Sequence, residues 1–491
     1  MLDRAQPTAA HRSPAARTSQ VVLESLDSSA AVVICSLIFA WAIHQAHITI
    51  LQPQWDYVGF SFAAPGLGTI AIMILLISIG SLAMPSRIER PSSMILLFLH
   101  VTVFVPGVTI ALCLRIDSLQ AYAPMLAVLT LVHVITGLVS RNGPAPPEGE
   151  TFVPGPEVTL LLIGVWALVT LLIIYIFGEI MRFASLTEVY NQRFAVDRST
   201  SIIGYIRSYY INLICPALVA IGLLRRNVVV VGIGCLGCLI AYMVDAQKAA
   251  LALPVLMIAM YYALRYAQNV AKLFTVPILF LAFLTLVCIV LRSTEVGFAL
   301  QSVFFTRGIA IPALTLVQYY DLFSTYGYTW WSNITGLSLI LPAPPAFAND
   351  PSWPALGQIV GDHYYGAGTN LNANANPYSG EGLAAGGLVG LLVIAIVMPL
   401  VAVIIRTAIS RSREFQADRT GALTSGKPLA LASALDKLHQ ATPKKPMELS
   451  QERLESVSHL FIVNPLKGNG MTRLFSTHPP VEERIRRLET M

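Results

Sequence analysis

Long uninterrupted runs of apolar residues constrain this chain more than any other feature of its sequence. They recur between residues 28 and 405, and each is about 18–24 residues long, the length that an α-helix needs to cross a bilayer. The composition agrees, because 12% of the residues are charged, against about 25% in soluble domains. We therefore expect an all-α polytopic membrane protein with about ten transmembrane helices and a small helical cytoplasmic C-terminal domain. The expected helices span roughly 28–45, 66–84, 92–114, 121–139, 158–178, 209–224, 227–244, 249–266, 271–291 and 383–405.

Positive charges set the expected orientation of these helices. Cytoplasmic connections carry an excess of lysine and arginine, and ten helices place the groups around Arg4, Arg87 and Arg406 on one side. Both termini are then cytoplasmic. Residues 1–27 are rich in Ala, Ser, Pro and Arg and are expected to form a disordered cytoplasmic tail. The domains expected after it are a transmembrane domain at 28–405, with a long outer loop at 292–382, and a C-terminal tail at 406–491.

Several cations fall on the opposite, outer face. Arg193 and Arg207 lie in the connection at 179–208, and Arg292 and Arg307 follow further along the chain. A miscount of the helices would explain them, but so would binding of an anionic group, because arginine pairs bidentately with phosphate oxygens. Lys248 stands beside an Asp at the mouth of a helical hairpin. It is either one partner of a surface pair or a residue that faces a cavity.

The long outer loop is rich in aromatic and amide side chains. Trp330 and Trp331 suit either an interfacial aromatic belt or stacking on sugar rings. Asn374 lies in an Asn-rich run that offers donors and acceptors to hydroxyl groups, although such a run also forms plain turns. Loops of this length are usually functional or disordered.

These features together resemble the oligosaccharide repeat-unit polymerases, the Wzy-type O-antigen polymerases. The resemblance covers residues 28–395 and rests on the helix layout, on YYDLF and WWS in the outer loop, and on NANPYSGEGLAAGGLVGLL before the last helix. It implies a glycosyltransferase of the bacterial inner membrane that needs no cofactor and polymerises oligosaccharide units carried on polyprenyl pyrophosphate. The outer arginines would hold the pyrophosphate. The base for the acceptor hydroxyl stays open among Asp321, Asp362, His363 and Glu381.

The same resemblance implies partners. These are the polyprenyl-pyrophosphate-linked oligosaccharide, the lipid bilayer, a flippase and a chain-length regulator, with no nucleic acid. A transporter of lipid-linked sugars would use the same arginines and is a second possible function.

The tail resembles a different family. Its strings SRSREFQAD, GKPLALASALDKL, SHLFIVNPL and LFSTHPPVEERI closely resemble the C-terminal part of the HtpX-type membrane zinc metalloproteases, over residues 390–491. The resemblance implies that Glu414 is a zinc ligand, that Asp418 supports it, and that His478 and Arg484 lie near the active site.

The other half of a zinc site is missing from the printed sequence. Such proteases need H-E-x-x-H, which supplies two histidine ligands and a general base, and no H-E-x-x-H occurs here. The sequence therefore favours a polysaccharide polymerase with a vestigial, proteolytically inactive tail. The alternative is an HtpX-type membrane metalloprotease or an inactive relative, with zinc as its cofactor.

Overall fold

The computed structural model of the protein describes residues 25–142, 154–183, 202–334, 336–367, 372–375, 379–441 and 479–491. Every regular element within these ranges is a helix, apart from one isolated backbone bridge between Arg87 and Leu273. The predicted all-helical class is confirmed. The chain divides into two compact units, of which unit 1 is Met1–Pro147 with Lys272–Met491 and unit 2 is Glu148–Ala271.

Seven helices in the described ranges are long and apolar enough to cross a membrane. They are Ser29–Val58, Ser92–Ala111, Ser118–Arg141, Pro156–Phe177, Ile203–Leu224, Ala249–Tyr266 and Glu295–Tyr326. Four of the expected spans are shorter apolar helices, such as Leu67–Leu82 with 16 residues, which at a rise of 1.5 Å per residue extends about 24 Å against a hydrocarbon thickness of about 30 Å. The chain is a multi-pass membrane protein, but the expected count of about ten helices is not confirmed.

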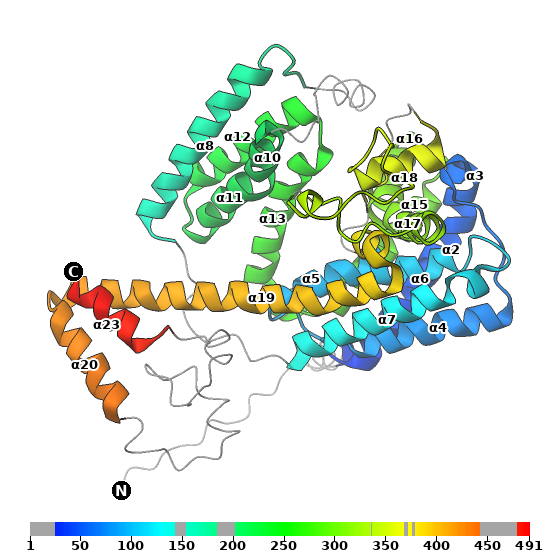
Figure 1. Ribbon diagram of the computed structural model, residues 1–491. Helices are drawn as coiled ribbons and strands as arrows, with labels where there is room; N and C mark the ends of the chain where they lie inside the picture. Colours follow the sequence, from blue (N-terminus) through cyan, green and yellow to red (C-terminus); the bar gives the residue numbers. More distant parts are fainter. Residues whose placement is uncertain are drawn as a thin grey trace, which may run out of the picture. The chain divides into compact units, whose positions relative to one another are not determined.

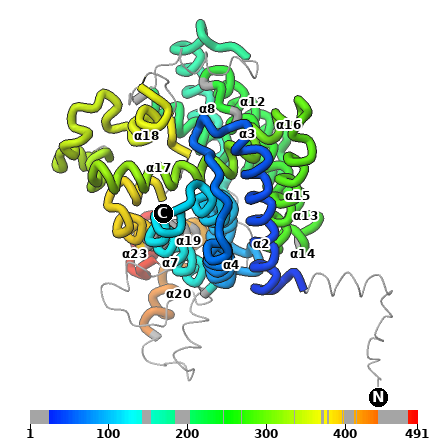
Figure 2. The backbone as a smooth tube through the Cα atoms, turned by 90° about the vertical axis from the view of Figure 1, so that its right-hand side faces the viewer, coloured from blue at the N-terminus to red at the C-terminus, as the bar shows by residue number. Residues whose placement is uncertain are grey.

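Unit 1 contains a bundle of helices that shares one apolar core (Figure 1). Its principal helices are α2 (Ser29–Ala46), α3 (Gln52–Trp55), α4 (Leu67–Leu82), α5 (Pro91–Leu99), α6 (Val105–Ala111), α7 (Ser118–Asn142), α15 (Thr275–Val290), α16 (Glu295–Leu300), α17 (Ile311–Tyr326), α18 (Leu356–Tyr365) and the long α19 (Ser379–Ser425). Helix α2 lies beside α4 and α15, which can be followed in the rotated view of Figure 2. Helix α17 packs against α6 and the first part of α19.

Short polar side chains cap the N-termini of some of these helices. The Ser28 hydroxyl accepts a hydrogen bond from the backbone N–H of Ala31 at the start of α2, at 3.1 Å. The Thr294 hydroxyl accepts from the N–H of Gly297 at the start of α16, at 3.0 Å. Each cap satisfies a backbone donor that has no partner inside its own helix.

The long helix α19 is interrupted near its start. Gly386 and Gly387 leave the helical conformation, and Gly387 adopts φ +58°, which glycine tolerates best. The carbonyls of Ala384 and Ala385 accept hydrogen bonds from the N–H groups of Thr329 and Trp330, at 2.8 and 2.9 Å. The turn that contains Thr329 and Trp330 thus satisfies backbone groups that the break leaves outside the helix.

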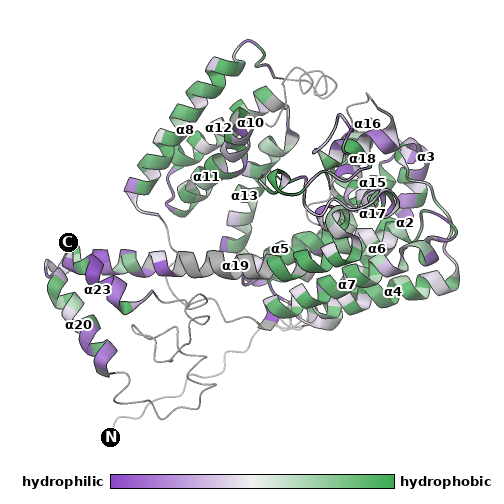
Figure 3. Cartoon of the chain, viewed as in Figure 1, coloured by the Kyte–Doolittle hydropathy of each residue, from purple (hydrophilic) through white to green (hydrophobic). Residues whose placement is uncertain are grey.

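The C-terminal residues of unit 1 form a small helical module. It comprises the last turns of α19, then α20 (Pro428–Ala441) and α23 (Val481–Glu489). Figure 3 colours most of α23 as hydrophilic, in contrast to the apolar surfaces of α4 and α7. A separate apolar cluster holds the three helices together and consists of Ala422, Leu431, Ala432, Leu435, Val481, Ile485 and Leu488.

Unit 2 has its own core. The helices of this unit are α8 (Pro156–Phe177), α10 (Ile202–Tyr209), α11 (Cys215–Leu224), α12 (Val228–Asp245), α13 (Lys248–Tyr266) and the short α14 (Gln268–Ala271). Helices α11 and α12 pack closely, because Gly222 and Gly234 have no side chains at the contact. A Cβ atom at either position would collide with the facing helix.

Candidate functional site

The best-defined polar cluster of the described residues lies in the C-terminal module. The Arg484 side chain, on α23, donates from Nε and Nη2 to the two carboxylate oxygens of Asp418 on α19, both at 2.7 Å. Its Nη1 donates to Oε2 of Glu414, one turn earlier on α19, at 3.1 Å. One guanidinium therefore holds two carboxylates, in the bidentate geometry that gives arginine its strongest pairing with Asp418.

The charged side chains of this cluster are largely buried. The side chains of Arg484 and Asp418 are only 7% and 10% exposed, and that of Glu414 is 21% exposed. Burial opposes the charge on Arg484, but the hydrogen bond to Asp418 and the charges of Asp418 and Glu414 outweigh it, and the pKa of Arg484 is raised. The guanidinium is therefore charged at every pH at which the protein is handled.

Local sequence places these groups. Glu414 and Asp418 are four residues apart on a continuous helix, so both point from the same face of α19. On α23, Val481, Arg484 and Leu488 are the buried positions, at the spacing of one helical face. The apolar residues of that face join the cluster of the module, and the packing brings Arg484 onto the two acids.

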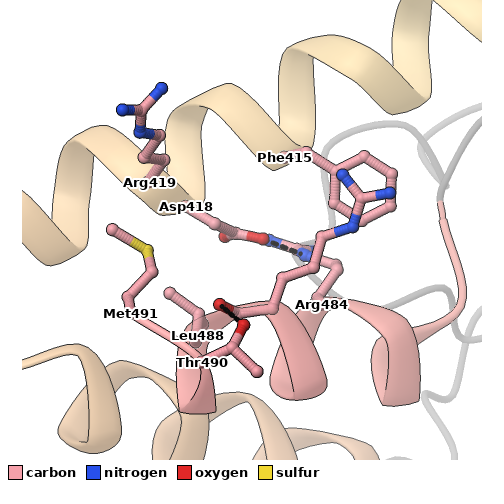
Figure 4. Close-up of a pocket in the computed structure, with 8 residues that line it drawn as sticks. Phe415, Asp418, Arg419, Arg484, Leu488, Thr490 and Met491 are labelled. Carbon is pink, nitrogen blue, oxygen red and sulfur yellow. Dashed lines mark hydrogen bonds and ion pairs between the residues drawn. The ribbon is translucent and has the colours of Figure 1, made fainter.

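A small cavity adjoins the cluster. It has a volume of about 210 Å³ and is lined by residues of α19 and by the end of the chain. Figure 4 shows Asp418 of α19 pointing toward Arg484 of α23, whereas the side chain of Arg419 points away from α23. The guanidinium of Arg487 also lies 3.7 Å from the centre of the Phe415 ring, a cation–π contact that adds to the packing.

Comparison with known proteins identifies this region. Residues 359–491 match the sequence model of Peptidase family M48. A protein named "Protease HtpX homolog" from Syntrophobacter fumaroxidans is 55% identical over 108 residues, which are 22% of this chain and 37% of that protein. Proteins of the same name from Sulfurihydrogenibium sp. and Thermococcus kodakarensis are 44% identical over 141 residues and 52% identical over 103 residues, covering 28% and 21% of this chain and 45% and 34% of theirs. No solved structure matches the chain.

The chain therefore spans about a third to a half of the curated relatives it matches. The match begins at residue 359, upstream of residue 390, where the protease resemblance was expected to begin. It includes the string NANPYSGEGLAAGGLVGLL, which was one basis of the polymerase resemblance.

These findings correct the predicted function. The polysaccharide polymerase and its glycosyltransferase activity are wrong, because residues 359–491 match Peptidase family M48 and the curated relatives are HtpX homologues, which supports the alternative reading over the polymerase. The resemblance of residues 28–395 to the polymerases is not shown by any comparison. The glycan carrier, flippase and chain-length regulator depended on that function and lose their basis with it, as does the expectation of no cofactor.

Zinc is the cofactor that this match implies, because M48 peptidases are generally zinc-dependent. The residues present do not make a zinc site by themselves. Among the residues that the structure describes, no three His, Cys, Asp or Glu side chains lie close enough to hold a metal ion. The Glu414 carboxylate is held by Arg484, His478 lies outside the described residues, and a catalytic zinc needs three protein ligands.

The cations that were expected to hold pyrophosphate lie in different units. Arg207 and Lys248 belong to unit 2, and Arg292 and Arg307 belong to unit 1. Arg207 is buried, with its guanidinium 5.3 Å from the centre of the Phe177 ring. Arg292 is exposed and donates to the carbonyl of Ile289 at 2.9 Å. Arg193 lies outside the described residues.

The four candidate bases have separate local roles. Asp362 accepts from Ser352 and Gln358, at 2.7 and 3.0 Å. His363 lies edge-on to the rings of Tyr326 and Tyr364.

The other two acids lie on α17 and α19. Glu381 accepts from Asn333 at 3.3 Å, and Asp321 accepts from the hydroxyl of Tyr122 at 3.0 Å.

The three loop residues expected to bind sugars are on the surface or partly so. Trp330 is 61% exposed and Asn374 is exposed, while Trp331 is half-buried. Both tryptophans have positive φ, which follows from the turn that docks on the break in α19.

Sequence reasoning missed a buried histidine pair in unit 1. Nδ1 of His100 lies 2.9 Å from Nε2 of His133, and Nε2 of His100 lies 2.8 Å from the Ser36 hydroxyl. All three are fully buried or nearly so. In the sequence His133 lies 33 positions and Ser36 lies 64 positions from His100. The sequence signal for this site was limited to the presence of polar residues in apolar runs.

Proposed function

We propose that this chain supplies the carboxylate half of an HtpX-type membrane metalloprotease site. Glu414 is the zinc-ligand carboxylate of that half-site, and Asp418 and Arg484 hold it in place. The two histidine ligands and the general base come from an H-E-x-x-H segment that the printed sequence does not contain. The single observation that carries the proposal is the buried pairing of Arg484 with both Asp418 and Glu414, in the region that matches Peptidase family M48.

The chemistry of the cluster supports this role. A ligand carboxylate must be ionised and fixed in orientation, and groups that orient a ligand support metal affinity. Arg484 donates a hydrogen bond to Glu414 and is itself fixed by two short hydrogen bonds to Asp418. Glu414 keeps a partly exposed side chain, which leaves its carboxylate accessible to a ligand set from outside the described residues.

The location of the half-site is part of the proposal. We place the C-terminal module on the cytoplasmic side of the bacterial inner membrane, with both termini cytoplasmic. The support is the arginine and lysine bias of the connections on that side.

The decisive experiment measures zinc and proteolysis with and without the missing half. The full-length chain is purified in detergent alone, and also after co-expression with the H-E-x-x-H-bearing segment of an HtpX homologue. Zinc content is measured by mass spectrometry of the metal, and cleavage is followed with fluorescent casein. We expect less than stoichiometric zinc and no cleavage for the chain alone, and both zinc and cleavage for the combination.

Variants separate the roles of the residues. Glu414→Ala in the combination should abolish bound zinc, whereas Glu489→Ala, on the exposed face of α23, should change neither zinc nor cleavage. The proposal fails if the combination binds no zinc, or if Glu414→Ala leaves zinc binding unchanged. Stoichiometric zinc in the chain alone would contradict the need for outside histidines.

A further inference from the structure

A second polar cavity lies in unit 1, away from the C-terminal module. It has a volume of about 140 Å³, and four separate stretches of the chain line it. Its charged and polar walls are Arg115, Tyr122, Asp321 and Tyr364, and its apolar wall includes Leu314 and Val317. No role in the proposed peptidase uses these residues.

The negative group of the cavity is Asp321. It stands on α17, which is the last part of the apolar helical stretch Glu295–Tyr326, and that stretch is long enough to cross a membrane. An ionisable residue in such a helix is costly unless it serves a function. One carboxylate oxygen, Oδ2, accepts a hydrogen bond from the hydroxyl of the buried Tyr122, at 3.0 Å. Its other oxygen faces no hydrogen-bond donor among the residues that the structure describes.

The positive group is Arg115, in the connection between α6 and α7. Its Nε donates to Asp117 at 2.9 Å, and its guanidinium lies 5.1 Å from the centre of the Tyr122 ring. Tyr122 therefore touches both charged groups, Arg115 through its ring and Asp321 through its hydroxyl. In the described part of the chain Arg115 pairs with Asp117 and forms no ion pair with Asp321, so a guanidinium and a carboxylate both line one small cavity without pairing with each other.

Neutral groups complete the wall. The Tyr364 hydroxyl donates to the carbonyl of Gln318, at 3.4 Å. Burial and the charge of Asp321 raise the pKa of Tyr364, although Arg115 opposes the shift, so the phenol stays a neutral donor. The side-chain amide of Gln318 is itself fixed by Tyr365, at 3.1 and 3.2 Å.

We propose that this cavity binds a small α-amino acid as its zwitterion. The ammonium group pairs with the Asp321 carboxylate, the carboxylate of the ligand pairs with the Arg115 guanidinium, and a small apolar side chain lies against Leu314 and Val317. The size of the cavity decides the class, because pockets for drug-sized ligands and cofactors have about 300–1,000 Å³. A cavity of about 140 Å³ matches a molecule of several heavy atoms and is well below the size of a pocket for a nucleotide or an oligosaccharide.

Calorimetric titration of the full-length protein in lipid nanodiscs tests the proposal, with L-alanine as the probe. Wild-type protein should bind L-alanine saturably. Ethylamine and propionate, which each carry one of its two charged groups, should bind at least about tenfold more weakly, because each forfeits a hydrogen-bonded charge pair. This comparison needs no variant and is unaffected by folding defects.

Two substitutions then assign the contacts. Asp321→Asn and Arg115→Gln should each weaken L-alanine binding by about tenfold or more, while Arg292→Gln, an exposed arginine outside the cavity, should leave it unchanged. The proposal is overturned if L-alanine shows no saturable binding, if ethylamine or propionate binds as tightly as L-alanine, or if well-folded Asp321→Asn and Arg115→Gln proteins both bind it as the wild type does. None of these measurements depends on Glu414, so their failure would leave the peptidase proposal unaffected.

Discussion

Replacement of Arg484 by methionine tests how the C-terminal module is held together. The substitution keeps an unbranched apolar stem and removes the guanidinium that holds Asp418 and Glu414. Breaking a buried ion pair from one side costs about 3–5 kcal/mol, because the remaining charge stays buried without a partner. Asp418 is nearly as buried as Arg484, but Glu414 is partly exposed. We therefore expect about 3 kcal/mol, the lower end of that range.

Hydrogen exchange of the α23 amides measures this loss directly. Because a tenfold change in an equilibrium corresponds to about 1.4 kcal/mol, the amides of Val481–Glu489 should exchange about 100-fold faster in Arg484→Met. Exchange in α4 and α7, in the core of the bundle, should not change.

The matched control is Arg486→Met on the same helix. Arg486 is 71% exposed and pairs with Glu483, which stabilises by about 0–1 kcal/mol, so exchange should rise only a few-fold. Adding Asp418→Leu to Arg484→Met should restore much of the protection, because the more buried of the two carboxylates that lost their partner is then removed. A rise below about threefold in Arg484→Met, or equal effects of Arg484→Met and Arg486→Met, would refute the reasoning.

Two further substitutions test packing. Gly137→Ala should lower the thermal midpoint of the detergent-solubilised protein, since its Cβ would lie 2.8 Å from the backbone oxygen of Ala83, at a cost of about 1–3 kcal/mol; Gly164→Ala, with open space around it, should raise the midpoint slightly. Leu435→Ala, a change at a side chain 1% exposed, should destabilise the C-terminal module by about 2–4 kcal/mol and speed its limited proteolysis. Leu429→Ala, at a side chain 64% exposed, should leave proteolysis unchanged; equal cleavage rates for both leucine variants would contradict the assigned apolar cluster.

The predicted polymerase shows where composition stops being informative. Outer arginines, tryptophans and asparagines were read as a sugar and pyrophosphate site, but the same residues occur in any long connection next to a membrane. Tryptophan is favoured at the interface and asparagine in turns. In the structure Trp330 docks its backbone on the break in α19, and Arg207 lies on Phe177. Residue type alone does not specify the chemistry of such a loop.

Other parts of the protein follow from the sequence directly. The length of the apolar runs determines a helical membrane protein, because a bilayer leaves no other way to satisfy the backbone of a single apolar segment. The four-residue spacing of Glu414 and Asp418 determines that they share a helix face, and the strings around them determine the resemblance to the HtpX-type proteases. The absence of H-E-x-x-H from the printed sequence determines that this half-site is incomplete within it.

Only the tertiary structure decides which distant groups meet. Arg484 reaches Asp418 across 66 positions, and Tyr122 reaches Asp321 across 199. Neither pairing has a local signal, because helix periodicity relates residues three or four apart and says nothing of which faces pack together. The apolar contacts between α19, α20 and α23 decide the first pairing, and the packing of α7 and α17 in the bundle core decides the second.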